Sequence, residues 1–276
     1  MKKKLVGLSV LIASILSTGA LAHGESDQFQ GLTDAVNSEF RQAKNITRDE
    51  FRHPLETLKF FNIQPSDTVI ELWPGGGWYA EILAPYLTEH GSYIAGNFDT
   101  NPVDEKQRNG FRAKAGKRFE LWLSENQTHL GSARTVTFDP PNFYRLGDDN
   151  SADAVLTFRN LHNWAMKGYL EPVFESAYSV LKPGGTFGVV EHRAKPGMDV
   201  KTGYMDQAEV IALAEKVGFT LVESSEVNAN PKDTKDYPKG VWTLPPRLAL
   251  GSQDKARYLS IGESDRMTLK FIKNSQ

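Results

Sequence analysis

The chain contains no cysteine. Without a thiolate it cannot form a disulfide framework or a cysteine-ligated zinc site. A lipoprotein anchor is also excluded, because lipid attachment needs a cysteine at the cleavage point. No two of the six histidines are spaced as a ligand pair; they are His23, His53, His90, His129, His162 and His192. We therefore expect no metal site.

Two further features are absent, namely a long basic run and the G-x-S-x-G motif. Without Lys2, Lys3 and Lys4, which belong to the leader described next, the 32 basic residues fall to 29 against 34 acidic ones, a net charge of about −5. An acidic chain without a basic run is not expected to bind nucleic acid. The missing motif argues against a serine nucleophile.

The N-terminus has the pattern of a secretory signal peptide. Three lysines precede an apolar run from Leu5 to Leu16, and the triplet Ala20-Leu21-Ala22 ends the segment. The run is shorter than the roughly 20 residues that span a bilayer, so a retained anchor is disfavoured. We predict a signal peptide over residues 1–22, cleavage after Ala22, no stable membrane anchor, and a periplasmic or secreted mature protein.

Beyond the leader, apolar segments typical of strands alternate with segments of helical periodicity. Strands are predicted over residues 68–73, 92–98, 134–138, 152–158, 186–191, 219–227 and 267–272. Helices are predicted over residues 55–61, 78–87, 103–126, 169–181 and 206–217. This alternation favours a mostly parallel sheet covered by helices. The predicted organisation is an N-terminal helical segment over residues 23–64 and one α/β domain over residues 65–276.

Residues 228–264 interrupt the alternation with a polar stretch. Its four prolines are Pro231, Pro238, Pro245 and Pro246. Its apolar group comprises Tyr237, Val241, Trp242 and Leu244. A loop this long within a compact domain is usually functional or disordered. Two alternatives stay open: a lid that closes over a substrate site, or an excursion packed permanently on the domain.

A strand, a glycine turn and a helix meet in the segment Glu71-Leu72-Trp73-Pro74-Gly75-Gly76-Gly77. In α/β sheets this arrangement places a ligand at the carboxyl edge, where glycines allow close approach of the backbone. Gly75, Gly77 and Ala80 match the dinucleotide pattern G-x-G-x-x-G/A. Glu71 instead suits a ligand with a positive charge, such as the ammonium group of a methionine moiety. A structural turn without a ligand is the third interpretation.

The same segment resembles the first motif of the class I S-adenosylmethionine-dependent methyltransferases, in which an acid precedes alternating glycines. Leu181-Lys182-Pro183-Gly184-Gly185-Thr186-Phe187 resembles the turn before their fifth strand. The likeness extends from about Pro65 to Lys273, and is closest to a group of exported bacterial proteins described as predicted methyltransferases. It implies a Rossmann-like α/β methyltransferase fold, with a seven-stranded, mostly parallel sheet and an antiparallel last strand.

The resemblance also implies S-adenosylmethionine as the cofactor. Asp99, after the second strand, would hold the ribose hydroxyls, and Asp139, after the third, would bind the adenine amino group. Trp73 departs from the family, because it stands where the first glycine of the motif usually lies, and we expect it to line or restrict the cofactor pocket. The implied cofactor-binding residues are Glu71, Trp73, Gly75, Gly77, Asp99 and Asp139.

Methyl transfer requires alignment of the reactants and, for some acceptors, a base. His162, just past the fourth strand, is the candidate catalytic base, because histidine titrates near neutral pH. Candidate substrate contacts lie at the same edge or on the N-terminal helical segment, and are Arg52, His53, Glu191, His192 and Arg193. Structural interpretations stay open for several candidates. His162 could be bonded to a neighbouring loop, and residues 191–193 could form a salt-linked loop. Asp99 could be a solvated strand end, and Asp139 a turn former.

The sequence thus favours an exported S-adenosylmethionine-dependent methyltransferase that acts on a small molecule or an envelope component. The cofactor is made in the cytoplasm and is charged, so two alternatives stay open. One is a non-catalytic exported binding protein that keeps the fold, which Trp73 favours. The other is a NAD-dependent oxidoreductase, supported only by Gly75, Gly77 and Ala80. No particular oligomeric state is predicted.

Overall fold

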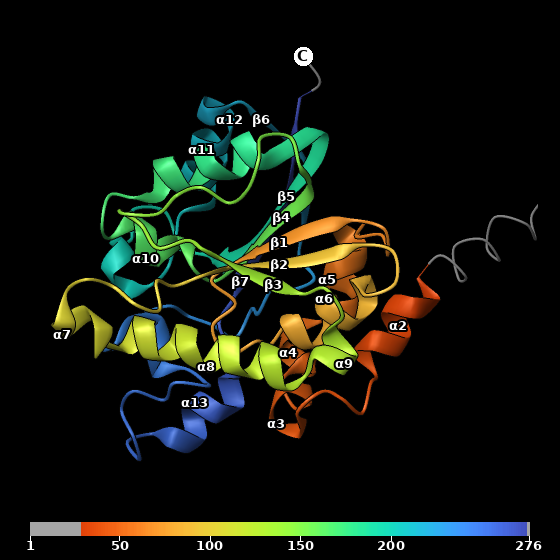
Figure 1. Ribbon diagram of the computed structural model, residues 1–276. Helices are drawn as coiled ribbons and strands as arrows, with labels where there is room; N and C mark the ends of the chain where they lie inside the picture. Colours follow the sequence, from red (N-terminus) through yellow and green to blue (C-terminus); the bar gives the residue numbers. More distant parts are fainter. Residues whose placement is uncertain (1–28, 275–276) are drawn as a thin grey trace, which may run out of the picture.

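A single seven-stranded sheet forms the centre of the molecule (Figure 1). The structure is a computed structural model that describes residues 29–274, so the predicted signal peptide lies outside the described part. The strands are β1 (Thr68–Leu72), β2 (Ser92–Asn97), β3 (Arg134–Thr137), β4 (Ala152–Phe158), β5 (Leu181–His192), β6 (Phe219–Ser225) and β7 (Arg266–Lys273). Their order is β3-β2-β1-β4-β5-β7-β6. Pairing is parallel throughout except that β7 runs antiparallel to both β5 and β6, which confirms the predicted fold class.

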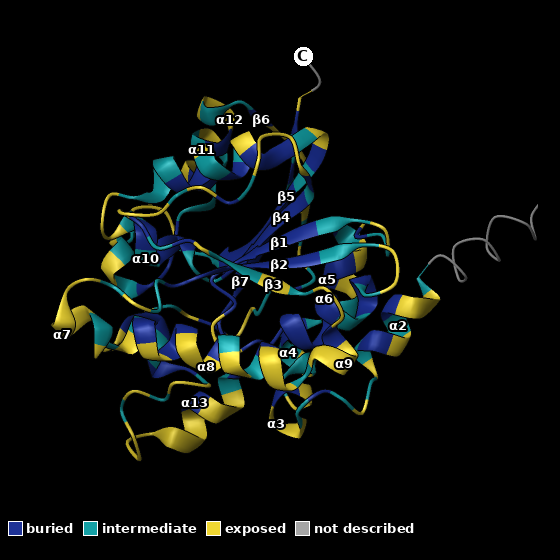
Figure 2. Ribbon diagram, viewed as in Figure 1, coloured by how far each residue is buried: buried dark blue, intermediate teal, exposed yellow. Residues whose placement is uncertain are grey.

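Helices cover both faces of the sheet because side chains alternate along each strand. On β1, Val69 packs in one hydrophobic cluster, with α6 (Ala80–Leu87), whereas Ile70 and Leu72 pack in another, with α11 (Leu170–Val180). The second cluster also holds residues of α10 (Leu161–Ala165) and α12 (Gln207–Val217). The five inner strands, β2, β1, β4, β5 and β7, are therefore buried along most of their length, whereas the edge strands β3 and β6 are mostly exposed or half-buried (Figure 2).

The sequence predicted one continuous helix over residues 103–126, and this prediction is wrong. The chain forms α7 (Glu105–Arg108) and α8 (Phe111–Glu125), separated at Gly110, and a short α9 (Gln127–Leu130) follows. Gly110 has an extended backbone, with φ −75° and ψ 173°. A Cβ atom there would lie 2.9 Å from the carbonyl oxygen of Gln107, so the break needs a residue without a side chain.

Among the described residues before β1, from residue 29 on, there are four short helices: α2 (Gln30–Val36), α3 (Ala43–Ile46), α4 (Asp49–Arg52) and α5 (Pro54–Phe60). Pro54 opens α5, where its missing N–H costs nothing. A bidentate ion pair from Arg41 to Asp49 closes the turn between α2 and α4. The segment between α2 and α5, which includes α3 and α4, reaches the carboxyl edge of the sheet, where the candidate site lies.

Residues 228–264 are packed against the domain and contain a 3₁₀ turn (Gly240–Thr243) and α13 (Lys255–Ile261). Tyr237, Leu244 and Tyr258 form a small apolar cluster of their own. Asp233 accepts hydrogen bonds from the hydroxyl of Tyr204, which lies outside the segment. No helix within residues 29–274 combines the length and the apolar composition that crossing a bilayer would require.

Candidate functional site

The glycine turn after β1 has three residues in the left-handed region of backbone space. The φ values are 49° at Trp73, 61° at Gly75 and 79° at Gly77. The backbone at position 73 therefore adopts the conformation that a glycine would take, although a tryptophan occupies it. A side chain there costs about 1–2 kcal/mol. The Trp73 N–H donates to the carbonyl of Gly96 at 2.8 Å, which anchors the turn to β2.

Three neighbouring cavities follow the carboxyl edge of the sheet. The arginine cavity, about 280 Å³, contains Glu71, Arg52 and Arg159 in its wall. The aromatic cavity, about 610 Å³, is lined by Phe98, Phe119 and Trp122, among others. The aspartate cavity, about 550 Å³, contains Asp99 and Asp139. Trp73, Gly75 and Gly76 border the first two cavities, and Phe111 and Arg112 border the second and third, so the three form a continuous row.

Glu71 lies in the wall of the arginine cavity with only 3% of its surface exposed. Its Oε2 atom accepts a hydrogen bond of 2.6 Å from the hydroxyl of Tyr93. Burial raises the pKa of Glu71 to about 7, against the opposing effect of the Tyr93 hydrogen bond and of nearby arginines. A ligand that brings a positive charge to this carboxylate would favour its ionised form.

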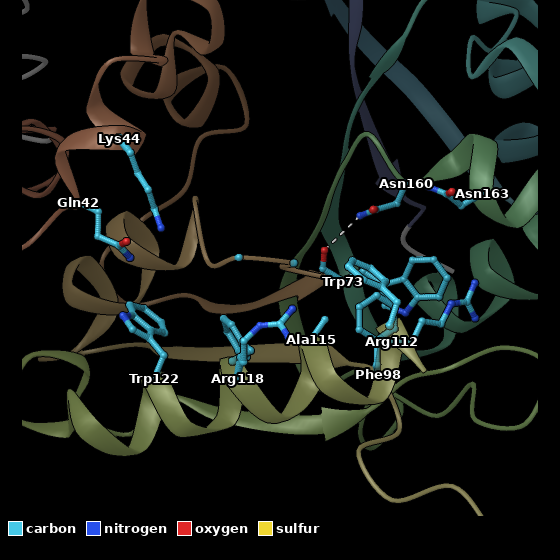
Figure 3. Close-up of a pocket in the computed structure, with 14 residues that line it drawn as sticks. Gln42, Lys44, Trp73, Phe98, Arg112, Ala115, Arg118, Trp122, Asn160 and Asn163 are labelled. Carbon is cyan, nitrogen blue, oxygen red and sulfur yellow. Dashed lines mark hydrogen bonds between the residues drawn. The ribbon is translucent and has the colours of Figure 1, made fainter. Parts of the chain in front are cut away.

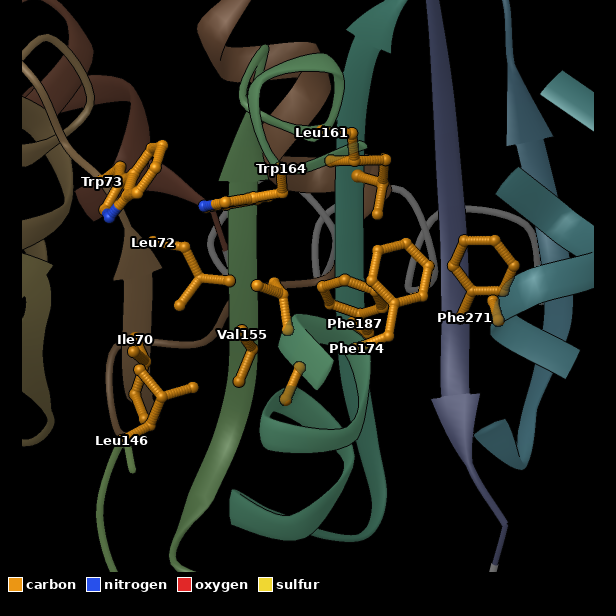
Figure 4. Close-up of a cluster of buried hydrophobic side chains, with 14 of the residues drawn as sticks. Ile70, Leu72, Trp73, Leu146, Val155, Leu161, Trp164, Phe174, Phe187 and Phe271 are labelled. Atoms are coloured by element: carbon orange, nitrogen blue, oxygen red, sulfur yellow. The ribbon is translucent and has the colours of Figure 1, made fainter. Parts of the chain in front are cut away.

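Trp73 lies at the boundary between the arginine cavity and the aromatic cavity. Its indole packs against Phe98 and Trp164, with ring centroids 4.8 and 4.7 Å apart, and its Nε1 donates to the carbonyl of Phe138. Figure 4 shows its ring beside that of Trp164 at one end of the core. The Arg112 guanidinium lies 4.5 Å from the centre of the Trp73 ring. In Figure 3, Trp73, Phe98 and Arg112 gather at one side of the aromatic cavity, across from Lys44 and Trp122.

Asp99 and Asp139 lie together, as expected for residues that follow neighbouring strands. The Asp139 carboxylate accepts from Arg112 Nη1 at 3.0 Å and from the Asp99 N–H at 3.3 Å. Asp99 accepts from the N–H of Asn101. Burial raises the pKa of Asp139, partly offset by Arg112. A ligand that used Asp139 would compete with Arg112 for this carboxylate.

His162 lies at the start of α10, beside Glu191 at the end of β5. The His162 Nδ1 atom is 3.1 Å from Glu191 Oε1, and 3% of the residue is exposed. The carboxylate also accepts from the N–H groups of Leu161 and His192, so it caps α10 and orients the imidazole. With the proton on Nδ1, the Nε2 lone pair faces the amide of Asn163 at 3.0 Å. Asn163 lines the aromatic cavity, so it separates the imidazole from that cavity.

His192 lies beside this pair. One atom that could ligate a metal ion, taken from each of His162, Glu191 and His192, lies within 4.8 Å of the other two. Spacing along the chain could not reveal this cluster, because β4 and β5 assemble it. The two carboxylate oxygens of Glu191 already accept four hydrogen bonds. His192 Nδ1 contacts the Ser264 hydroxyl at 2.5 Å, and burial, followed by the charge of His162, lowers the pKa of His192. These contacts describe a hydrogen-bonded dyad with a neutral neighbour.

Arg193 and His53 are not brought to the cavities described above. The Arg193 guanidinium binds Glu226 at 2.6 Å and Asp265 at 2.9 Å, and these two carboxylates raise its pKa. It therefore has the salt-linked arrangement considered as its structural alternative. His53 sits between α4 and α5 with φ 41°, and its Nδ1 atom has no hydrogen-bond partner among the described residues.

Sequence reasoning missed most of the arginine cavity. Besides Arg52, its wall includes Asn45 and Arg48 from the N-terminal helices and Arg159 from the end of β4. The only sequence signal was the position of Arg159 directly after a strand, at the edge where ligands bind. Asn160 was also missed. Its amide donates to the carbonyl of Leu72 at 2.9 Å and so fixes the β4 end against the glycine turn.

No family model matches the chain, and no curated protein sequence matches it. Solved structures share its architecture. A SAM-dependent methyltransferase from Aquifex aeolicus is 16% identical, with a TM-score of 0.52 over 82% of this chain and 93% of that chain. A proposed sarcosine dimethylglycine methyltransferase from Galdieria sulphuraria is 17% identical, with a TM-score of 0.52 over 84% of this chain and 88% of that chain. The chain has the class I methyltransferase fold.

A third structure limits what this methyltransferase fold implies. The cyclase SpnF is 15% identical, with a TM-score of 0.50, and the match covers 92% of this chain and 96% of that chain. A fold shared by proteins named as methyltransferases and as a cyclase does not by itself determine the reaction. The function of the present methyltransferase-like chain must therefore be argued from its own residues.

Proposed function

We propose that the chain binds S-adenosylmethionine along the row of cavities and transfers the methyl group to an acceptor. The observation that carries this proposal is the position of Glu71 beside the glycine turn, with Asp99 and Asp139 after the next two strands. An acid at each of these three strand ends matches the charges and hydroxyls of an adenosyl amino acid. The proposal uses the class I fold only as the scaffold that brings these acids together.

Each acid would recognise a different part of the ligand. Glu71 would accept the ammonium group, Asp99 the ribose hydroxyls and Asp139 the adenine amino group. Gly75 and Gly76 support this placement, because a Cβ atom built on either would meet nothing within 4 Å. The turn therefore presents bare backbone to the cavities, where a ligand can approach closely.

The bound cofactor would supply an electrophilic methyl group on a sulfonium. The chain would align the acceptor in the aromatic cavity, and His162 would take the acceptor's proton when the acceptor is a hydroxyl or a protonated amine. The new carbon–heteroatom bond forms as the carbon–sulfur bond breaks. Glu191 would stabilise the resulting imidazolium through Nδ1, and Asn163 would have to turn aside to free Nε2.

The acceptor is proposed to be a small molecule or an envelope component, since we also propose that the mature chain is exported. The basic and apolar N-terminus supports export. An exported enzyme would need a supply of cofactor outside the cytoplasm.

Affinity measurements on variants test the placement of the cofactor. Glu71→Ala should weaken binding of S-adenosylhomocysteine, whereas Arg145→Ala, at an exposed ion pair with Asp148, should not. Asp139→Asn should reduce the preference for adenosine over inosine analogues. If Glu71→Ala binds as well as the wild type, the cofactor has been placed wrongly.

A non-catalytic binding protein is the second candidate, and Trp73 with Arg112 is the observation that favours it. Both occupy space between the acids that would hold the two ends of the ligand. If the chain is a non-catalytic binding protein, it should bind S-adenosylmethionine. The bound cofactor should then keep its labelled methyl group in the presence of an envelope extract. Transfer of the label to a component of that extract would exclude it.

A further inference from the structure

The arginine cavity contains more positive charge than its surroundings neutralise. Arg48, Arg52 and Arg266 all bond to a single carboxylate, that of Glu263, which is 2% exposed. Burial alone would raise the pKa of Glu263, but the arginines, Arg266 first, hold it below its usual range. Arg159 is a fourth guanidinium near this group.

Arg159 has no hydrogen bond or ion pair from its side chain to any residue within 29–274. It follows β4 in the left-handed region, with φ 63°, and is partly buried in the cavity wall. Burial lowers the pKa of Arg159 to about 10, and the nearby Arg266 adds to this effect. A partly buried cation without a protein partner, beside other cations, is costly, so its position calls for an explanation.

Two further donors in the same wall are also unsatisfied. Arg52 is 3% exposed and Asn45 is 7% exposed, and both line the cavity. The Arg52 Nη1 and Asn45 Nδ2 atoms have no hydrogen-bond partner in the described part of the chain. Unpaired buried polar groups are rare in native proteins and often mark a missing ion or ligand group.

The groups of Arg159, Arg52 and Asn45 are all N–H donors, and each lacks an acceptor. Glu71, the acid of the cavity, has a pKa of about 7 because of its burial, and so contributes only part of a negative charge near neutral pH. A planar guanidinium matches the oxygens of a carboxylate or phosphate with paired hydrogen bonds. An oxyanion is therefore the group that would satisfy the site.

We propose that the arginine cavity is an anion-binding site in which Arg52, Arg159 and Asn45 hold a carboxylate or phosphate group of a ligand. The site goes beyond the proposed function and does not depend on it, because its evidence is the unsatisfied donors alone. The anion has two sources that share this chemistry: the amino-acid end of an adenosyl cofactor, or an anionic group of another ligand.

Thermal unfolding in inorganic phosphate, at ionic strength matched with sodium chloride, tests the site. Phosphate should raise the Tm of the wild type, and Arg159→Gln should remove more than half of this rise. In chloride alone, Arg159→Gln should have a higher Tm than the wild type, because it removes an unpaired cation from among other cations. Arg145→Gln, the exposed control, should keep the full phosphate effect.

If Arg159 has only a structural role, the opposite changes in Tm are expected. If Arg159→Gln lowers the Tm in chloride and keeps the phosphate effect, the anion site is refuted. Arg52→Gln is a second variant, but it breaks an ion pair and could fail to fold. The test depends on Arg159→Gln and stands without the Arg52→Gln result.

The source of the anion follows from two adenosine ligands. S-adenosylhomocysteine carries the amino-acid end, and 5′-methylthioadenosine lacks it. If Arg159→Gln weakens binding of the first by about tenfold and leaves the second unchanged, as loss of one charged hydrogen bond would, the cofactor supplies the anion. If phosphate protection depends on Arg159 but neither adenosine ligand binds, the anion site stands and the proposed methyltransferase function fails.

Discussion

Replacing Trp73 by glycine tests whether the indole restricts ligand binding along the row of cavities. A ligand that spans from Glu71 to Asp139 would have to displace the Trp73 ring from Phe98 and Trp164 and from the Arg112 guanidinium. Each aromatic pair contributes about 0.5–1.5 kcal/mol, and a cation–π contact about 0.5–1 kcal/mol. The displacement therefore costs about 1.5–4 kcal/mol. Since about 1.4 kcal/mol is a tenfold change in affinity, Trp73→Gly should tighten binding of S-adenosylhomocysteine by about tenfold to several hundredfold.

The same variant should lose stability. Removing a buried tryptophan costs about 3–5 kcal/mol, and relief of the left-handed backbone at position 73 returns about 1–2 kcal/mol. Urea denaturation should give a net loss of about 1–4 kcal/mol. Trp73→Phe, which keeps an aromatic ring in place, is the control and should bind like the wild type. A folded Trp73→Gly variant with unchanged affinity would refute the reasoning, because the indole would then lie outside the ligand's path.

Three further outcomes are expected. Burial raises the pKa of Glu71 to about 7, above its unfolded value, so the folded chain increasingly carries a buried carboxylate as the pH rises. The stability of the wild type relative to Glu71→Gln, from denaturation between about pH 5 and pH 8, should therefore fall with pH, and a constant difference would contradict the assignment. A lid over residues 228–264 should be cut readily by protease in the free chain and protected by cofactor with acceptor. Equal cleavage in both states, or none in either, would leave the segment a structural excursion. Mass spectrometry of the protein from cells should find His23 at the mature N-terminus, and soluble protein with Met1 intact would remove the export proposal.

Local patterns were sufficient to predict the sheet but not every helix. Apolar runs such as Thr68–Leu72 and Ala152–Phe158 are buried strands in the structure, as their composition predicted. The short helix α10 was missed, because its first N–H groups are capped by Glu191, thirty residues later in the chain. The break at Gly110 was missed because the residues on both sides have helical periodicity.

The candidate site divides in the same way. Glu71, Asp99 and Asp139 could be found because each lies within two residues of the end of a strand, and parallel strands end at one edge. The arginine cavity could not, since Arg52, Arg159 and Glu263 are far apart in the chain and meet only through the packing of the N-terminal helices. The dyad of His162 and Glu191 likewise depends on the pairing of β4 with β5.

Calorimetric titration of the mature protein with S-adenosylmethionine, S-adenosylhomocysteine and NAD, each in turn, tests the central claim most directly. We expect saturable 1:1 binding of both adenosyl amino acids, weakened by Glu71→Ala, and no binding of NAD. Binding of NAD without binding of either adenosyl amino acid would contradict the claim and favour the oxidoreductase alternative.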